Sequence, residues 1–418
     1  ANALAGNGKM PEPLGRDSTP QGGNAPSLSK MLRRNEMVSR VVSMALRVVV
    51  RDLRVVAMDV RVVATALRVV AMILIMAPLG LLAPMTVQAQ ASGRLLVVNK
   101  AGESLSVVDL SEGREIARVP TGYAPHEVAA SPDGRTAVVT NYGTRDQPGN
   151  TLTVVDLATL QPVATIDLGE QLRPHGIMWL PGTDRVAVTT EGSGTLTVVD
   201  VAERSVVAAV PTSQRVSHQV SITPDASRAF VANIGSGSVT AIDLQAMTVV
   251  ESIPTGAGAE GVAVAPDGSE VWVTNRAENT VTILDAHTLE ILATLPSAEF
   301  PIRVVFTPEG SRGLVTNARS AELRVFDPQR RRELMAIPIE APVIEGRDQV
   351  IAFEGSPSPI GLLAHPDGRH VFVAAASGDA VAVVDLEAGA VVDLIAVGEE
   401  PDGLALVPAP SGSGTLSR

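Results

Sequence analysis

The sequence predicts an all-β fold, a seven-bladed β-propeller with four strands in each blade. The evidence is a phrase that recurs seven times, a period just above forty residues, and short β-forming runs separated by turn residues. Each repeat contains an apolar strand, a turn around Pro-Asp-Gly or a variant, the phrase Val-x-Val-Thr-Asn and a closing Val-Val-Asp. Successive closing aspartates are 47, 44, 43, 42, 42 and 58 residues apart. They are Asp109, Asp156, Asp200, Asp243, Asp285, Asp327 and Asp385.

One repeat shows why the pattern indicates strands. From Gly261 the chain reads GVAVAPDG, SEVWVTN, NTVTILD and LEILATLP, four runs rich in Val, Ile and Thr. In the first turn, Pro266 presets φ, Asp267 bonds to nearby backbone and Gly268 accepts a positive φ. Residues 93–410 show no sustained helical periodicity, so the whole span is predicted to be β-structure.

The ends of the repeat array predict how the ring closes. The first repeat begins in mid-blade, with LLVVN (Leu95–Asn99) as its second strand, and the last, GLALVP from Gly403, supplies only an inner strand. We therefore expect the C-terminal strand to lie beside the three N-terminal strands. Such closure removes the exposed sheet edges that an open array would keep.

The repeated phrases carry a family resemblance. AVVTN (137–141), VWVTN (271–275), GLVTN (313–317) and AFVAN (229–233) resemble the YVTN repeat of bacterial and archaeal seven-bladed propellers. The likeness covers about residues 93–410, although VAVTT (186–190) and VFVAA (371–375) lose the Asn. The resemblance implies a superfamily that includes surface-layer proteins, periplasmic binding propellers, lactonase-like enzymes and the haem d1 domain of nitrite reductase.

The first ninety residues differ in kind from the repeats. Residues 1–39 are rich in Gly, Pro, Ser and Asn without periodicity, which predicts disorder or a non-native leader. Five heptads follow from Arg40 to Leu74: RVVSMAL, RVVVRDL, RVVAMDV, RVVATAL and RVVAMIL. They indicate either a coiled coil or a translated tandem DNA repeat upstream of the true start. At the other end, residues 411–418 are expected to form a flexible tail.

A secretory signal peptide is predicted next. The run from Val69 to Gly93 is uncharged, follows a basic flank and ends in Ala89-Gln90-Ala91, which is typical of cleavage after Ala91. This predicts a periplasmic or extracellular protein with no stable membrane insertion once the signal is removed. A retained anchor is the alternative, and Pro78, Pro84 and the short apolar length oppose it.

Charge and cysteine content exclude several classes. Residues 1–91 hold eleven basic and five acidic side chains, which leaves residues 92–418 with a net charge of −18, against −12 for the whole chain. So acidic a domain repels phosphate backbones, and we expect no nucleic-acid partner. The chain has no cysteine, which excludes disulfides, c-type haem attachment, thiolate metal sites and a cysteine nucleophile.

One column of residues carries the sharpest functional signal. The inner strands can be aligned on their Pro turns, and the sixth residue before each Pro is expected to lie at one mouth of the central channel. In ring order this column is Asp402, His126, His175, His218, Glu260, Ile302 and Ile360. Three of the six histidines in the chain thus fall on consecutive blades, flanked by an acid on each side.

Three interpretations of this column stay open. His126, His175, His218 and Glu260 are suited to a divalent transition metal such as zinc, copper or iron. The same groups can act as acid and base, because His titrates near neutral pH. The third interpretation involves neither metal nor catalysis. The column then forms a water-filled polar mouth that binds ligand, or its imidazoles have only the structural role of hydrogen bonding to a neighbouring blade.

The next position on each inner strand reads Gly403, Glu127, Gly176, Gln219, Gly261, Arg303 and Gly361. The four glycines let backbones crowd together at the axis. Arg303 is expected to form an inter-blade salt bridge, or to balance the acidic groups across the channel or bind an anionic ligand.

Two segments on the same face interrupt the repeat: the loop 141–150, which carries Tyr142, Arg145 and Asp146, and the insertion 340–359. Each is a lid over the mouth or a tolerated insertion. The closing aspartates and the repeat asparagines are expected to bond to local backbone. The other histidines, His287, His365 and His370, are expected to be exposed towards the opposite face.

These observations lead to three functional hypotheses. The first is an exported, non-enzymatic propeller that binds a small molecule, a metal or a protein at its histidine-bearing mouth. The candidate ligand-binding residues are His126, His175, His218, Glu260, Asp402, Arg303 and Tyr142. The second is a lactonase-type hydrolase that uses His126, His175, Glu260 and Arg303. The third is a metal- or haem-linked redox accessory protein, which only the resemblance implies.

Overall fold

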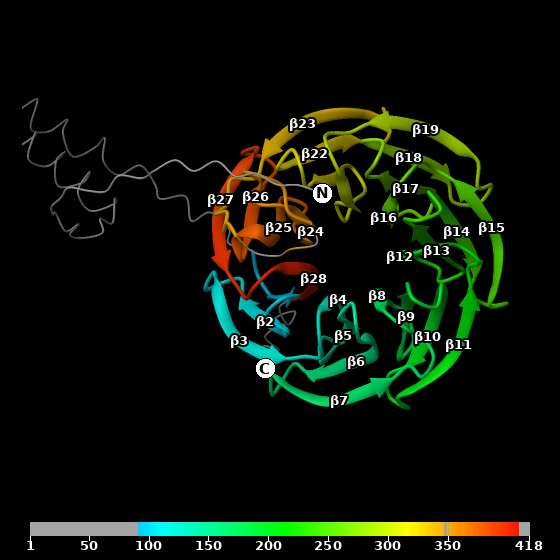
Figure 1. Ribbon diagram of the computed structural model, residues 1–418. Coiled ribbons are helices and arrows are strands. Elements are labelled where there is room, and N and C mark those ends of the chain that lie inside the picture. The colour runs from blue at the N-terminus through cyan, green and yellow to red at the C-terminus, as the bar shows by residue number, and fades with distance from the viewer. Residues whose placement is uncertain (1–90, 347–348, 350, 409–418) are drawn as a thin grey trace, which may run out of the picture. The chain divides into compact units, whose positions relative to one another are not determined.

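The computed structural model describes residues 91–346, 349 and 351–408. Their strands form seven four-stranded antiparallel sheets around a central axis (Figure 1), so the predicted all-β, seven-bladed propeller is confirmed. The predicted leader, the heptads, the signal peptide as far as Gln90 and the tail at 411–418 lie outside these residues. Within the described part of the chain, no helix is long and apolar enough to span a membrane.

The blades follow one another along the chain, apart from the one that closes the ring. That blade contains β28 (Pro401–Val407), β1 (Arg94–Asn99), β2 (Ser104–Asp109) and β3 (Arg114–Pro120). The next three blades contain β4 (Pro125–Ala130), β5 (Thr136–Gly143), β6 (Pro148–Asp156) and β7 (Gln161–Asp167); β8 (Pro174–Trp179), β9 (Arg185–Thr190), β10 (Thr195–Asp200) and β11 (Ser205–Pro211); and β12 (Ser217–Ile222), β13 (Arg228–Asn233), β14 (Ser238–Asp243) and β15 (Thr248–Pro254).

The last three blades keep the same order. They contain β16 (Ala259–Val264), β17 (Glu270–Asn275), β18 (Thr280–Asp285) and β19 (Ile291–Pro296); β20 (Pro301–Phe306), β21 (Gly313–Asn317), β22 (Glu322–Asp327) and β23 (Arg332–Pro338); and β24 (Pro359–Ala364), β25 (His370–Ala375), β26 (Ala380–Asp385) and β27 (Ala390–Ala396). A single 3₁₀ turn, η1 (Ala376–Gly378), interrupts the strands of the described residues.

Ring closure takes the predicted form. Strand β28 pairs antiparallel with β1, with Leu406 opposite Leu95 and Leu404 opposite Val97. In Figure 1 the red C-terminal strand completes the blade that also holds β2 and β3. The two ends of the array therefore share one sheet, and no open blade remains among the described strands.

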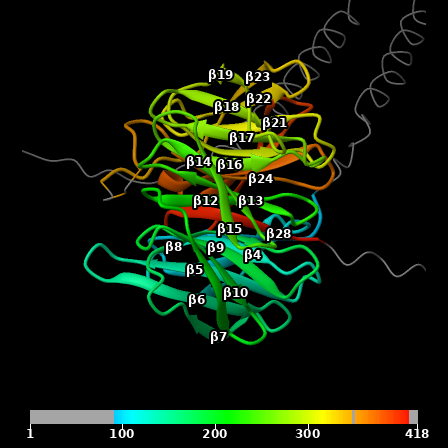
Figure 2. The same ribbon diagram turned by 90° about the vertical axis from the view of Figure 1, so that its right-hand side faces the viewer.

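The core lies between neighbouring blades. One cluster joins Phe230 and Val239 of one blade to Val262 and Val273 of the next. The middle strands are buried on both faces, as in β17, whereas the outermost strand of each blade faces solvent, as in β15. Figure 2 shows β15 at the rim of the ring, nearest the viewer. Hydrophobic burial thus holds the ring together blade against blade.

The predicted channel glycines are required by close packing. A Cβ at Gly176 would lie 2.7 Å from the carbonyl oxygen of His218, and one at Gly403 would lie 2.5 Å from that of His126. Gly261 and Gly361 face the carbonyls of Ile302 and Asp402 in the same way. Each glycine therefore permits the inner strand of the next blade to approach.

The two recurring polar positions of the repeat, the closing Asp and the Asn, make different hydrogen bonds. Asp156 accepts the backbone N–H groups of Ala158 and Thr159 at 2.9 and 2.7 Å, the local turn that was predicted. Asn141 instead donates to the Thr151 and Thr153 hydroxyls at 3.0 Å and accepts the N–H of Gly122 at 3.0 Å. The prediction of purely local bonds is thus wrong for Asn141, which ties its neighbouring strand to the loop entering the blade.

Candidate functional site

The backbone at the start of each inner strand points its first residues toward the channel. In all seven blades, the second residue before the predicted column has a positive φ, between 44° and 75°. These residues are Ala124, Arg173, Val216, Gly258, Phe300, Ser358 and Glu400. A register shift follows in each inner strand of the six undivided blades, as between Pro125 and Val128 of β4. Such bulges re-aim side chains beside functional sites.

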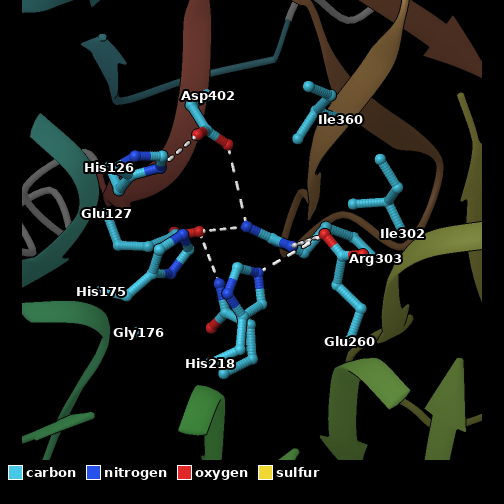
Figure 3. Close-up of polar contacts among 12 residues, drawn as sticks. His126, Glu127, His175, Gly176, His218, Glu260, Ile302, Arg303, Ile360 and Asp402 are labelled. Carbon is cyan, nitrogen blue, oxygen red and sulfur yellow. Dashed lines mark hydrogen bonds and ion pairs between the residues drawn. The ribbon is translucent and has the colours of Figure 1, made fainter. Parts of the chain in front are cut away.

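The structure brings the three predicted histidines together at one mouth of the channel (Figure 3). The ring centroids of His126 and His175 are 4.4 Å apart, and those of His175 and His218 are 3.8 Å apart. His175 and His218 are 3% and 7% exposed. Three stacked imidazoles on consecutive blades therefore form one side of the mouth.

Carboxylates hold the outer two rings. His126 Nδ1 lies 2.9 Å from Asp402 Oδ2. His218 lies between two carboxylates, with Nδ1 2.5 Å from Glu191 Oε1 and Nε2 3.4 Å from Glu260 Oε1. Burial opposes charge on both rings. It lowers the pKa of His126 despite Asp402, whereas the hydrogen bond to Glu191 and the nearby Glu260 carboxylate raise the pKa of His218 to about 9.

The central ring, His175, has no such partner. Its Nδ1 is buried and makes no hydrogen bond. Burial, followed by the neighbouring His218 and His126, holds the pKa of His175 well below its ordinary value, so the ring is neutral. The mouth therefore contains a neutral imidazole with an unsatisfied ring nitrogen, which is costly in a buried site unless something binds it.

Glu191 is a site residue that the sequence interpretation missed. It follows β9 directly, and its Oε2 accepts the Tyr142 hydroxyl at 2.5 Å while Oε1 faces His218. The sequence does contain a pattern that could have revealed Glu191. The residue just after each Val-x-Val-Thr-Asn phrase occupies an equivalent position in every blade, which gives a second column of residues. That column is Lys100, Tyr142, Glu191, Ile234, Arg276, Ala318 and Ala376.

Tyr142 reaches the mouth from the longer loop. Residues 141–150 largely extend the β5–β6 hairpin, and the Tyr142 ring lies 4.8 Å from that of His126. The guanidinium of Arg173 lies 4.9 Å from the Tyr142 ring and donates to the carbonyls of Thr144 and Arg145 at 3.1 Å. Arg145 and Asp146 are exposed at the tip. The hairpin thus contributes one aromatic side chain to the site.

Arg303 lies across the channel. It donates to Glu127 Oε1 at 2.5 Å, and its guanidinium nitrogens lie 3.7 Å from Asp402 and 3.9 Å from Glu260 (Figure 3). Glu127 belongs to β4 and Arg303 to β20, in blades that are not neighbours. Arg303 therefore mainly balances acidic side chains across the channel, as one of its predicted roles required. Its contact with Glu260 of the adjacent blade is longer, at 3.9 Å.

Glu127, Gln219 and Arg303 form a polar layer across the channel. Below it lies a cavity of about 650 Å³ lined by Glu127, Gln219 and Arg303, by apolar inner-strand residues, and by prolines of the opposite turns. None of the three stacked histidines lines that cavity. Gln219 also donates to Glu127 at 2.5 Å. The stacked histidines therefore lie outside this cavity, and Glu127 and Arg303 lie between the two.

The insertion covers the apolar side of the mouth. Ile302 and Ile360 are buried in a cluster with Phe300 and Phe353, and Ser356 Oγ donates to the Ala318 carbonyl at 2.6 Å. In its described part, segment 340–359 packs over the isoleucines. The polar half of the mouth is formed by other blades.

The side chains that lie close enough together at the mouth to hold a metal overlap only partly with the four predicted candidates. Ligand atoms of His175, Glu191 and His218 all lie within 4.8 Å of one another. Glu260 is instead bonded to Arg276 at 2.7 Å, and His126 to Asp402. Carboxylate and imidazole donors of this kind suit zinc, copper or iron.

The expected exposure of the remaining histidines is partly wrong. His287 is exposed, but His365 and His370 are only 6% and 5% exposed. The reason is local packing, because His365 stands against the ring of Phe372 and both imidazoles face the Asp367 carboxylate of their turn.

The chain forms a seven-bladed β-propeller whose repeats resemble the YVTN repeat. A family model described as Cytochrome D1 heme domain matches residues 182–305, which include Glu191, His218, Glu260 and Arg303. No curated protein matches the chain.

Solved structures share the fold at low sequence identity. Hydrazine synthase of Kuenenia stuttgartiensis is 19% identical, with a TM-score of 0.58, over 73% of this chain and 98% of that chain. The periplasmic gluconolactonase of Pseudomonas aeruginosa is 20% identical, with a TM-score of 0.62, over 76% and 99%. Dihydro-heme d1 dehydrogenase is 17% identical, with a TM-score of 0.53, over 74% and 65%. At these identities the likeness concerns the fold.

Proposed function

We propose that the protein is a binding propeller whose mouth holds a divalent transition metal, zinc, copper or iron, through His175, His218 and Glu191. The observation that carries the proposal is the buried, unpartnered Nδ1 of His175 beside the other two residues. A metal would satisfy that nitrogen and would replace the proton that otherwise lets His218 bridge Glu191 and Glu260.

The surroundings suit a small, oxygen-bearing ligand on such a metal. Three protein ligands leave coordination positions open. Arg173 lies beside Tyr142 and Arg276 beside Glu260, and each guanidinium has further N–H groups that can bond to an anionic oxygen. We therefore propose that the exported protein captures a small anionic molecule at the metal.

The same mouth does not fit a haem. His126 and His218 have side chains only 16% and 9% exposed, and His175 lies stacked between them. No imidazole of the three stands free above an open slot, so the redox hypothesis has only the match to residues 182–305 behind it.

Metal analysis of the purified full chain tests the proposal. We expect one equivalent of bound ion to be lost in a His175→Ala/His218→Ala variant and retained in the matched control His287→Ala, which changes an exposed histidine. Glu191→Gln provides a second, milder test of the same site. A metal content equal to that of the wild type in both mouth variants, or no metal in the folded wild type after metal loading, would overturn the proposal.

A lactonase-type hydrolase is the second candidate, favoured by the His126–Asp402 pair. A neutral imidazole held by a carboxylate at 2.9 Å is the arrangement of a general base. The fold likeness to a gluconolactonase supports testing sugar lactones. Hydrolysis that is abolished by His126→Ala, while the His287→Ala control remains active, would establish this activity; no hydrolysis by the metal-loaded chain would dismiss it.

A further inference from the structure

A second group of histidines lies at the other end of a blade, in the turn between β24 and β25. The sequence there is His365-Pro366-Asp367-Gly368-Arg369-His370. His365 Nδ1 lies 3.0 Å and His370 Nδ1 2.6 Å from the same oxygen, Asp367 Oδ2. Both imidazoles are buried, whereas the Asp367 side chain is 33% exposed. Two ring nitrogens thus converge on one carboxylate that reaches solvent.

The hydrogen bonds of His365 set its tautomer. Its Nε2 lies 3.0 Å from the carbonyl oxygen of Ser92, which can only accept, so Nε2 carries the hydrogen. Its Nδ1 therefore carries no hydrogen, and its lone pair accepts only a long contact from the backbone N–H of Asp367 at 3.3 Å, which a cation at this nitrogen would replace. That lone pair stands 3.0 Å from the Asp367 carboxylate oxygen, so two electron-rich atoms face each other. A cation between them removes the repulsion.

The repeat itself does not require these imidazoles. The same turn is closed by the backbone of Ser131 and Thr136 in one blade and by Ala265 and Glu270 in another. In the first of these, the Ser131 hydroxyl caps the turn by accepting the N–H of Thr136 at 3.0 Å. The histidine pair is therefore an addition to a turn that closes without it.

We propose that His365 Nδ1, His370 Nδ1 and Asp367 Oδ2 bind a divalent transition metal, with Zn²⁺ as the probe. Ligand atoms of the three residues lie within 4.8 Å of one another, and the exposed side of Asp367 leaves room for water at an open position. The Ser92 carbonyl that accepts from His365 is the outer partner that a metal-bound imidazole commonly has.

The site would act as a clamp at the ring-closure seam. Ser92 precedes β1 in the closing blade, whereas His365 belongs to the adjacent blade. Ala91 and Phe372 lie in one hydrophobic cluster across that seam. A metal that fixes the His365 ring would therefore hold the incoming chain against the neighbouring blade and stabilise the folded state by mass action.

The test uses the full chain, stripped with a chelator and titrated with Zn²⁺ by calorimetry and by thermal unfolding. In Asp367→Asn the amide oxygen can still cap the turn, but the anionic ligand is lost; we expect at least a tenfold weaker affinity at one site and a smaller Zn²⁺-induced rise in Tm. The matched control is Asp133→Asn, in the turn of another blade without histidines, and should behave as wild type.

The outcomes separate this site from the mouth. Loss of one equivalent of Zn²⁺ in Asp367→Asn, with the equivalent retained in His175→Ala/His218→Ala, supports the clamp even if the mouth binds no metal. His365→Gln/His370→Gln should lose the same equivalent. An Asp367→Asn variant with the Zn²⁺ affinity and the Zn²⁺-induced rise in Tm of the wild type would overturn the clamp.

Discussion

His218 Nδ1 lies 2.5 Å from Glu191 Oε1, although the two residues belong to different blades. The bond joins the inner strand of one blade to the end of the second strand of the preceding one. With Glu260 on the other side, it makes His218 the one imidazole of the stack that is charged at neutral pH. Several consequences can be measured.

The first concerns stability against pH. The pKa of His218 is raised from 6.5 to about 9, so its stabilising contribution is complete below pH 6.5 and is lost as pH rises through 9. We expect the unfolding free energy of the metal-free protein to fall across this window, and Glu191→Gln to flatten the fall. Denaturant unfolding between pH 6 and 10 measures it, with Glu203→Gln, at an exposed turn, as the control. An identical slope in Glu191→Gln and wild type would contradict the assignment.

Proton release should accompany metal binding at the mouth. Because a coordinating His218 must lose the proton that it carries below pH 9, Zn²⁺ affinity should rise about tenfold per pH unit in that range. Calorimetry in buffers of different ionisation enthalpy counts the released protons. No proton release at pH 7 would mean that His218 is not a ligand.

The Arg303–Glu127 pair predicts a large asymmetry between single and double variants. Arg303→Met leaves Glu127 buried without its cation and should destabilise the protein by about 3–5 kcal/mol. Arg303→Met/Glu127→Met removes both charges and should recover much of that loss. Urea unfolding compares the variants; a double variant that is no more stable than the single one would show that the pair is not the main interaction of Arg303.

Close packing at the axis gives a test of the fold. In Gly176→Ala the new Cβ would meet the His218 carbonyl at 2.7 Å, so we expect a loss of about 1–3 kcal/mol and a disturbed mouth. Gly102→Ala meets its nearest atom at 3.2 Å and should cost less. Thermal unfolding compares the stabilities of the two variants. Equal stability would show that the inner strands can move apart freely.

The insertion can be tested through Phe353. Its ring lies 5.0 Å from that of Phe300 and 4.7 Å from the Arg319 guanidinium. Phe353→Ala should loosen segment 340–359 and speed amide exchange around Ile302 and Ile360, with little change near His175. Hydrogen-exchange mass spectrometry measures both regions. Unchanged exchange at the isoleucines would mean that the insertion does not cover them.

The architecture was predictable because the same sequence pattern occurs seven times along the chain. Strand alternation, Pro turns and a period just above forty residues reappear in each blade, so local propensity and ring closure agree. The histidine column followed from the same register, since equivalent positions of equivalent strands meet at the axis. Glu191 was missed because only the inner strands were aligned; its place, one residue beyond Thr190, belongs to the second strands.

What the sequence by itself determined is therefore the blade count, the closure and which inner-strand residues line the mouth. The tertiary structure alone decided their chemical states. His126, His175 and His218 occupy equivalent positions, yet one pairs with Asp402, one has an unpartnered nitrogen and one lies between two acids. Their pKa values diverge because burial and the nearest charge act through space, across blades that are far apart in the chain.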